Sequence, residues 1–173
     1  YNLSGSKVNF LTKKFNRLSE NDINLQDLNT KGGNFKMKKI GVLGTGTMGA
    51  GIIQVLAQNG YEVVMRARRE SSVEKGLATV KKNLDKMVAK EKITAEEAEA
   101  VFARIHGSTD INIIADADLV IEAATEDMEA KKALFAELDK LCKPDTIIAT
   151  NTSSLSITEI AAATGRPDKV IGM

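Results

Sequence analysis

The sequence predicts an α/β domain built on a parallel β-sheet. Short apolar runs typical of buried strands alternate with longer segments that have the helical spacing of apolar residues, and short loops join them. Two observations carry this prediction. The apolar run 38–43 leads through a glycine-rich loop into a helical pattern, and the run 118–124 is followed by an amphipathic segment at 128–141. Such alternation is typical of right-handed crossovers, so we expect a ligand crevice at the carboxyl ends of the strands.

The composition is that of an ordinary globular protein and excludes several functional classes. The 173 residues give room for one domain plus an extension, and 43% of them are apolar and 27% charged. A net charge of +1 gives no indication of nucleic acid or a membrane surface as a partner. No apolar run reaches the roughly 20 residues needed to span a bilayer. The only cysteine, Cys142, has no partner for an internal disulfide, so we expect a cytoplasmic protein.

Residues 1–36 differ from the rest of the chain. They begin with Tyr1, are rich in Asn and Ser, and show no sustained helical or strand period. Lys31-Gly32-Gly33 precedes Met37, and these three residues can be encoded by a ribosome-binding sequence in front of a start codon. We therefore predict that 1–36 is a disordered, non-native leader and that 37–173 is the folded domain. A genuine disordered arm or a tag is the alternative interpretation.

A glycine-rich loop follows the first predicted strand. The run 38–43 leads into Gly44-Thr45-Gly46-Thr47-Met48-Gly49, which has the spacing G-x-G-x-x-G. A helical pattern begins at once, Asn59-Gly60 ends it, and 61–66 has the composition of a second strand. In such a unit the first glycine permits a tight turn, the second lets the backbone approach a pyrophosphate, and the third lets helix and strand pack closely. The sequence therefore predicts a Rossmann-type, doubly wound dinucleotide-binding domain, with cofactor contacts at Gly44, Gly46, Thr47, Met48 and Gly49.

The residues after the second strand predict which dinucleotide binds. Domains that bind NAD carry an acidic residue about 20 positions beyond the glycines, where it accepts hydrogen bonds from the ribose. Here that position is Ala67, followed by Arg68 and Arg69. An acidic side chain would repel a 2′-phosphate, whereas guanidinium groups provide charge-assisted contacts to it. We therefore expect NADP(H) to be preferred over NAD(H); the alternative is that both arginines are solvated loop residues.

The middle of the chain predicts a helical hairpin after the second strand. The segment 71–90 has an apolar stripe and a basic opposite face, and Ser71 to Glu74 has the pattern of a capping box. A second capping box, Thr94 to Glu97, opens a helix that we expect to continue to about Ile105. Taken alone, the lysines of the basic face have the ordinary interpretation of a solvated surface.

The second half continues the alternation of strands and helices. Strands are predicted at 118–124, 146–150 and 169–173, and Ser156 to Glu159 caps a short helix. Thr125 and Glu126 follow the first of these strands, and Asn151 to Ser154 follow the second. Both sets are therefore expected to lie at the ligand crevice.

Three motifs in register resemble the 3-hydroxyacyl-CoA dehydrogenases. They are GTGTMGAGI from Gly44, LVIEAATE from Leu119 and NTSSLSIT from Asn151, and the resemblance extends over 37–173. Within the family, the short bacterial 3-hydroxybutyryl-CoA dehydrogenases are the most similar. The resemblance implies a NAD(P)-dependent oxidoreductase that interconverts (S)-3-hydroxybutyryl-CoA and acetoacetyl-CoA, or other 3-hydroxyacyl-CoA and 3-oxoacyl-CoA pairs, by hydride transfer.

The resemblance also implies roles for individual residues. Ser153 is similar to the active-site serine that hydrogen-bonds the C3 oxygen of the substrate, and Asn151 would lie beside the nicotinamide. Glu126 and Lys131 match positions that line the cofactor ribose. A serine hydroxyl alone has far too high a pKa to act as the base, and no metal is implied.

The remaining parts of the family's site fall elsewhere. Lys86 and Lys90 match a basic helix face that binds the phosphates of CoA. The family's base is a histidine that follows the last strand, and the chain stops at Met173, before that position. His106 does not match this position. We expect His106 to lie in the connection after the hairpin and to be structural or solvated. A helical C-terminal domain that closes the substrate cleft and forms a homo-oligomer would also follow. We therefore expect this fragment to bind a dinucleotide without turning over acyl-CoA.

Other interpretations stay open. A 3-hydroxyisobutyrate or 6-phosphogluconate type dehydrogenase would share the G-x-G-x-M-G opening but lack the run 151–154 and the lysine-bearing hairpin. A non-catalytic dinucleotide-binding module, acting as a redox sensor or interaction domain, is a second alternative. A segment of a multifunctional fatty-acid oxidation protein is a third, against which a start at Met37 argues. Ala67 departs from the acidic residue usual in the family, so the resemblance alone would mislead about the cofactor.

Overall fold

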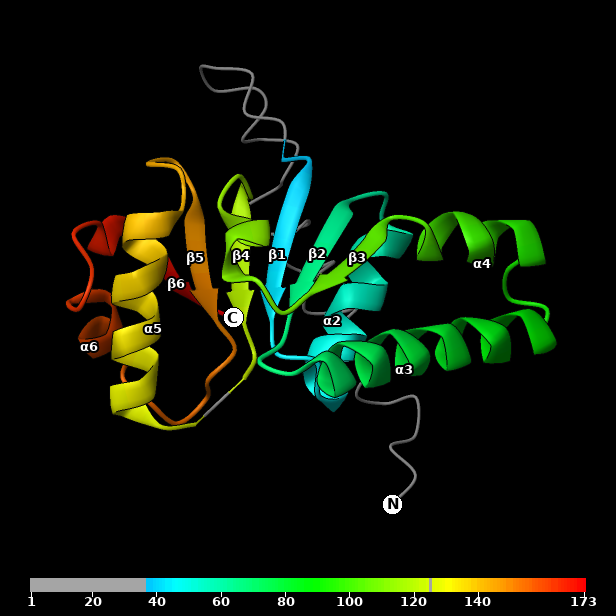
Figure 1. Cartoon of the computed structure of the whole chain (residues 1–173), viewed down its shortest axis with the longest axis horizontal. Coiled ribbons are helices and arrows are strands. Elements are labelled where there is room, and N and C mark those ends of the chain that lie inside the picture. Colours follow the sequence, from blue (N-terminus) through cyan, green and yellow to red (C-terminus); the bar gives the residue numbers. More distant parts are fainter. Residues whose placement is uncertain (1–36, 125) are drawn as a thin grey trace. The chain divides into compact units, whose positions relative to one another are not determined.

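The computed structural model describes residues 37–124 and 126–173, so the leader predicted at 1–36 and the crevice position Thr125 lie outside the described residues. The unit Lys38–Met173 contains a parallel sheet with the strand order β3-β2-β1-β4-β5-β6 (Figure 1). Its strands are β1 (Lys39–Leu43), β2 (Glu62–Arg66), β3 (Ile105–Ser108), β4 (Leu119–Glu122), β5 (Ile147–Thr150) and β6 (Val170–Gly172). This order is that of a doubly wound Rossmann-type sheet, so the predicted fold class is confirmed.

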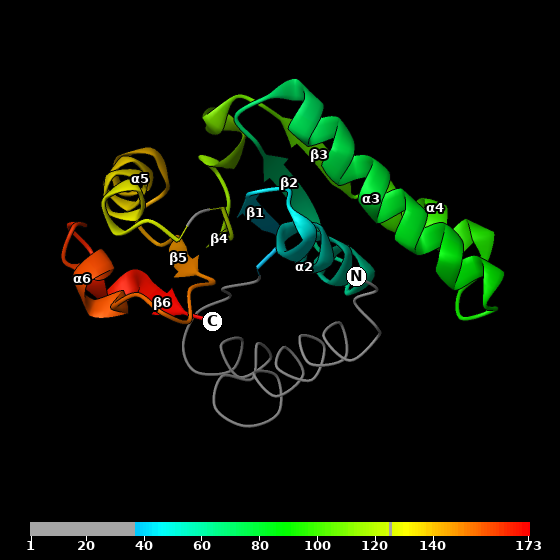
Figure 2. The same cartoon turned by 90° about the horizontal axis from the view of Figure 1, so that it is seen from below.

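Helices cover both faces of the sheet (Figure 2). They are α2 (Thr47–Gln58), α3 (Glu70–Ala89), α4 (Ala95–Phe102), α5 (Met128–Leu141) and α6 (Ile157–Ala161), with short 3₁₀ helices η2 (Ile111–Ile114) and η3 (Pro167–Lys169). Helix α2 packs against β1, β2 and α3 on one face, while α5 lies on the other. No helix in the described part of the chain is long and apolar enough to cross a membrane.

The core on the α5 face joins strands from both halves of the sheet. Val64, Val120 and Ile148 from the strands form one buried cluster with Phe135 and Leu138 of α5. Full burial of each such side chain contributes about 1.5–3 kcal/mol. Since side chains alternate along a strand, the residues two positions beyond Val120 and Ile148 also face α5. These two residues, Glu122 and Thr150, are polar, and they lie beneath the site described below.

The helical hairpin forms as predicted, but its first helix begins differently. Helix α3 starts at Glu70, and its N-cap is Arg69, whose side chain makes no capping hydrogen bond. The capping box predicted at Ser71 to Glu74 is therefore wrong, because both residues already lie inside the helix. The second box is confirmed: the Thr94 hydroxyl accepts from the Glu97 N–H at 3.1 Å, and the Glu97 carboxylate accepts from the Thr94 N–H at 2.8 Å.

The end of the hairpin also differs from the prediction. Helix α4 ends at Phe102, and Ile105 begins strand β3, which pairs in parallel with β2. The prediction of a helix through Ile105 and of a connection at His106 is therefore wrong. His106 lies exposed on β3, a strand at the edge of the sheet in the described chain. Only one residue of this strand, Ile105, is buried, which explains why the sequence has no strong strand pattern here.

Candidate functional site

The loop between β1 and α2 has the backbone geometry that its glycines require. Gly44 has φ +103°, and a Cβ there would lie 2.6 Å from the carbonyl oxygen of Ala123. A Cβ at Gly49 would lie 2.0 Å from the carbonyl oxygen of Gly44, so the helix can approach the strand only with glycine at this position. By contrast, a Cβ at Gly46 would meet no atom within 4 Å, because this residue faces open space. Helix α2 begins at Thr47, and its first N–H groups have no helical acceptors.

A cavity of about 360 Å³ lies beside this loop. Its walls come from the carboxyl ends of β1, β2 and β4, the start of α3 and one face of α5. They comprise Leu43, Gly44, Thr45, Gly46, Arg66, Ala67, Arg68, Ser72, Ala123, Ala124, Ala130 and Leu134. The glycine loop, Ala67 and Arg68 therefore lie together, as expected. Arg69 is exposed as the N-cap of α3 and is not part of the wall. Thr47, Met48 and Gly49 at the start of α2 do not line the cavity either, and Gly49 is buried.

Several cavity residues were not identified by sequence reasoning. Arg66, whose Nε donates to the carbonyl of Thr109 at 3.2 Å, is a second arginine among the lining residues, in addition to Arg68. The Thr45 hydroxyl donates to the carbonyl of Ser72 at 2.8 Å, and this bond joins the glycine loop to the first turn of α3. Variable positions of the glycine motif give no sequence signal for such a contact. The last residue of the second strand, Arg66, could have been found from its place next to Ala67.

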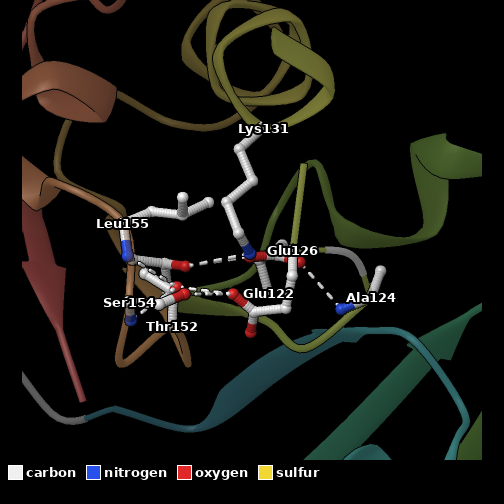
Figure 3. A network of polar contacts seen from close by, with 8 residues as sticks. Glu122, Ala124, Glu126, Lys131, Thr152, Ser154 and Leu155 are labelled. Carbon is white, nitrogen blue, oxygen red and sulfur yellow. Dashed lines mark hydrogen bonds and ion pairs between the residues drawn. The ribbon is translucent and has the colours of Figure 1, made fainter. Parts of the chain in front are cut away.

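A buried cluster of polar side chains lies beneath the loops that follow β4 and β5 (Figure 3). Glu122, at the end of β4, accepts hydrogen bonds from the Ala124 N–H at 2.7 Å and the Thr150 hydroxyl at 2.9 Å. Lys131 of α5 forms an ion pair with Glu122 and donates to the Thr150 hydroxyl at 3.4 Å. The side chains of Glu122 and Lys131 are 0% and 1% exposed. Strand register explains the arrangement, because Glu122 and Thr150 are direct partners across β4 and β5.

This cluster places Lys131 differently from its expected position beside the cofactor ribose. Its ammonium lies in the interior and is engaged by Glu122 and Thr150, so in this structure it supports the site from below and does not line the cavity. Burial of an ion pair costs solvation that must be offset by close geometry and further hydrogen bonds, and the described contacts supply them. The Thr150 hydroxyl contributes two of these contacts, one to Glu122 and one to Lys131.

Glu126 connects the loop after β4 to the loop after β5. One of its carboxylate oxygens, Oε2, accepts from the Thr152 hydroxyl at 2.8 Å and from the Ser154 hydroxyl at 3.1 Å. Ser153, between these two residues, is exposed, and its hydroxyl makes no hydrogen bond within the described ranges. Asn151 extends the strand pairing, because its N–H donates to the carbonyl of Glu122 at 2.8 Å. The structure thus brings Glu126, Asn151 and Ser153 to the carboxyl ends of adjacent strands.

The other predicted site residues lie apart from the cavity. Lys86 and Lys90 are exposed near the carboxyl end of α3, whereas Ser72 at its other end lines the cavity. His106 is on β3 and is not part of the cavity wall. Across the residues that the structure describes, no group of three or more His, Cys, Asp and Glu side chains is arranged to hold a metal ion.

Comparisons with known proteins agree with this geometry. Residues 39–173 match the family model described as 3-hydroxyacyl-CoA dehydrogenase, NAD binding domain. The 3-hydroxybutyryl-CoA dehydrogenase of Clostridioides difficile is 50% identical over 135 residues, which are 78% of this chain and 48% of that protein. A probable 3-hydroxybutyryl-CoA dehydrogenase of Deinococcus radiodurans is 44% identical over the same shares.

A solved structure shows the same relationship. The crystal structure of (S)-3-hydroxybutyryl-CoA dehydrogenase from Ralstonia eutropha is 43% identical, with a TM-score of 0.78, and the match covers 80% of this chain and 49% of that one. The chain therefore spans about half the length of the relatives it matches. The domain binds a nicotinamide dinucleotide, for which the open glycine loop and the adjoining cavity are suited. Since the family model covers most of the chain, the chain belongs to the 3-hydroxyacyl-CoA dehydrogenase family and carries its NAD binding domain.

Proposed function

We propose that this chain is the cofactor-binding part of an oxidoreductase that interconverts (S)-3-hydroxybutyryl-CoA and acetoacetyl-CoA, or related 3-hydroxyacyl-CoA and 3-oxoacyl-CoA pairs. The dinucleotide, when bound, accepts or supplies the hydride. The observation that carries the proposal is that the glycine loop and the Ser153 loop lie at the same edge of the sheet. They follow β1 and β5, the two strands on either side of β4. The names of the relatives, 3-hydroxybutyryl-CoA dehydrogenases, support the choice of substrate.

The hydroxyl of Ser153 is the substrate-facing group in this proposal. Thr152 and Ser154 both use their hydroxyl hydrogens on Glu126, so Ser153 has the hydroxyl of this run that is free to donate to the C3 oxygen of the substrate. A hydroxyl orients and polarises that oxygen but does not take up its proton, because its pKa is too high. Lys86 and Lys90, exposed on α3, would bind the phosphates of CoA through charge.

The nicotinamide end of the cofactor would lie against Asn151 and Glu126. Glu126 has a second carboxylate oxygen, Oε1, that makes no hydrogen bond among the described residues. That oxygen is available to accept a hydrogen bond from a ribose hydroxyl. The expected ribose contact of Glu126 is therefore compatible with its bonds to the loop after β5.

The finer assignment of the cofactor, NADP(H) in preference to NAD(H), is also part of this proposal. Ala67 carries no negative charge to repel a 2′-phosphate, and Arg66 and Arg68 line the same cavity. Both can donate charge-assisted hydrogen bonds to a phosphate. Arg69, outside the wall, would act only through its charge.

A side-by-side titration of the chain with NADPH and NADH, followed by calorimetry, tests the proposal. We expect tighter binding of NADPH, with an affinity that falls steeply as salt is added, because exposed charges are screened. Tighter binding of NADH would overturn the cofactor preference alone. Failure to bind either dinucleotide would overturn the proposed function of this site.

We further propose that the whole enzyme is a cytoplasmic homo-oligomer that acts on acyl-CoA and binds neither nucleic acid nor membranes. The nearly neutral net charge of the chain supports the exclusion of polyanionic partners. The buried, free Cys142 is compatible with a reducing compartment. Sedimentation of the enzyme expressed with all of its domains would test the oligomeric state, and a monomer would contradict it.

A further inference from the structure

The loop that carries Ser153 is held from inside by one buried hydroxyl. Thr152 is 4% exposed, whereas its neighbours Ser153 and Ser154 are exposed. The Thr152 hydroxyl donates to Glu126 Oε2 at 2.8 Å. The Thr152 hydroxyl oxygen, Oγ1, in turn accepts from the N–H of Leu155 at 3.3 Å and from the N–H of Ser154 at 3.5 Å (Figure 3). A single side chain therefore fixes the turn on the carboxyl side of Ser153 and connects it to the loop after β4.

The Thr152 hydroxyl links the Glu126 carboxylate to the backbone N–H groups of the turn that follows Ser153. Because Thr152 donates its one hydrogen to Glu126, its lone pairs are directed to the two N–H groups. Ser154 adds a second bond to the same carboxylate oxygen, so Glu126 holds the residues on both sides of Ser153. A bond to a charged acceptor is stronger than one between neutral groups. The turn is thus determined by the carboxylate as well as by local backbone preference.

We propose that Thr152 is a positioning residue for the Ser153 loop and for the nicotinamide end of the cofactor site. It touches neither cofactor nor substrate in this proposal and acts through Glu126, Ser153 and Asn151. The inference rests on the proposed function where it concerns the cofactor, and on the structure alone where it concerns the turn. Loss of the Thr152 hydroxyl would release the turn and leave Glu126 with one loop partner, whereas the adenine half of the site, formed by the glycine loop and Arg68, would be unaffected.

Two variants of Thr152 separate the hydroxyl from the shape of the side chain. Thr152→Val keeps the volume and removes the hydroxyl, and Thr152→Ser keeps the hydroxyl. Thr146→Val is the matched control, because Thr146 is equally buried and its hydroxyl donates to the carbonyl of Ala117 at 2.7 Å, at the other end of β5. Amide hydrogen exchange of Ser154 and Leu155 reports on the turn in each variant.

We expect exchange at the Leu155 amide to accelerate by about tenfold in Thr152→Val, because the loss of a buried hydrogen-bond acceptor costs roughly that factor. Thr152→Ser should restore the wild-type rate, and Thr146→Val should leave it unchanged. Unchanged exchange in Thr152→Val would overturn the inference and leave the proposed function standing.

A binding comparison then tests the effect on the cofactor site. The dinucleotide that the wild-type chain binds more tightly is titrated beside its own adenine half, 2′,5′-ADP for NADPH or 5′-ADP for NADH. Thr152→Val should weaken the whole dinucleotide by about tenfold and leave the adenine half unchanged. Equal weakening of both ligands would mean a general loss of structure and would overturn the inference. If the wild-type chain bound none of these ligands, the proposed function would fail, while the exchange result would still decide the role of Thr152 in the turn.

Discussion

At the amino ends of β1, β4 and β5, polar side chains bind neighbouring elements of the fold. At the carboxyl ends of the same strands, several polar residues face a cavity or solvent. Asp118, just before β4, accepts from the N–H groups of Lys38 and Lys39 at 2.8 and 3.1 Å and from the Lys143 ammonium at 2.8 Å. The Thr146 hydroxyl donates to a backbone carbonyl close by. Each of these contacts joins the start of one element to another.

The connection from α6 to β6 belongs to the same closed end. The Arg166 guanidinium donates to the Asp139 carboxylate and to the backbone carbonyls of Asp139, Cys142 and Lys143. These carbonyls belong to the end of α5, where the helix leaves its last acceptors unpaired. Burial raises the pKa of the Cys142 thiol, so this sulfur is an apolar filler and not a reactive thiolate.

At the carboxyl ends of the strands, the polar residues that hold the loops are buried, while the surface of the loops is exposed. Glu122, Lys131 and Thr150 bind one another in the interior, whereas Ser153 and the middle of the glycine loop, Gly46 to Met48, are exposed. From this difference we infer that the exposed donors of the Ser153 loop and the glycine loop depend on the buried cluster of Glu122, Lys131 and Thr150. Disruption of this cluster is costly, because removing one charge of a buried ion pair takes away the interaction that offsets the desolvation of the other.

The largest effect is expected from breaking that cluster. Lys131→Met removes the ammonium from the buried ion pair with Glu122. The free energy of unfolding, measured by urea denaturation, should fall by about 3–5 kcal/mol. The neighbouring substitution Lys132→Met is the control, because Lys132 pairs with Glu129 and Glu159 at the surface. A surface pair contributes about 0–1 kcal/mol, so equal losses in the two variants would contradict the comparison.

The glycine loop gives the second prediction. Gly49→Ala places a methyl group 2.0 Å from the Gly44 carbonyl oxygen, so the loop must shift away from α2. We expect dinucleotide affinity, measured by calorimetry, to fall by at least about tenfold, since the phosphate-binding geometry depends on this close approach. Gly51→Ala is the matched control: a Cβ there meets no atom within 4 Å, and alanine inside a helix should stabilise by roughly 0.5–1 kcal/mol. Similar affinities in the two variants would show that the close approach is not needed for binding.

The contrast between these two regions also explains what the sequence could predict. The glycine loop, the strands at 38–43 and 118–124, the capping box at Thr94 and the N-cap at Ser156 depend on residues near one another in the chain, and the structure confirms them. The capping box predicted at Ser71 is wrong, because helix α3 begins at Glu70 and the pattern from Ser71 to Glu74 therefore lies inside the helix.

Contacts between residues far apart in the chain could not be predicted from the sequence. The pairing of Glu122 with Lys131 and Thr150 depends on the register of β4 with β5 and on the side of the sheet that α5 covers. For Lys131 the family resemblance implied a contact with the cofactor ribose, and nothing in the sequence indicated its buried ion pair with Glu122. Strand β3 was missed for another reason: it is short and mostly polar at an edge of the sheet, where packing does not impose an alternating pattern.

The third prediction concerns the cofactor at the open end. Ala67→Asp introduces a carboxylate into the wall that holds Arg68, and it should lower the ratio of NADPH to NADH affinity by about tenfold through repulsion of the 2′-phosphate. Arg68→Gln should lower the same ratio, whereas Arg69→Gln, outside the wall, should change it less. Paired titrations of the two dinucleotides give the ratio. An unchanged ratio in Ala67→Asp would count against the proposed preference for NADP(H).

The smallest effect is expected from acid at the closed end. Burial acts to raise the pKa of Asp118, but hydrogen bonds from Lys143 and from the N–H groups of Lys38 and Lys39 outweigh it, so the pKa is lowered from its ordinary value of 3.8. A lowered pKa in the folded state means that the carboxylate stabilises the fold fully above that ordinary value and loses this contribution as pH falls through the lowered one. Urea midpoints of the wild type and Asp118→Asn should therefore differ at pH 7 and converge progressively below about pH 3.8. A difference that stays constant down to about pH 2 would mean that Asp118 acts through shape and not through its charge.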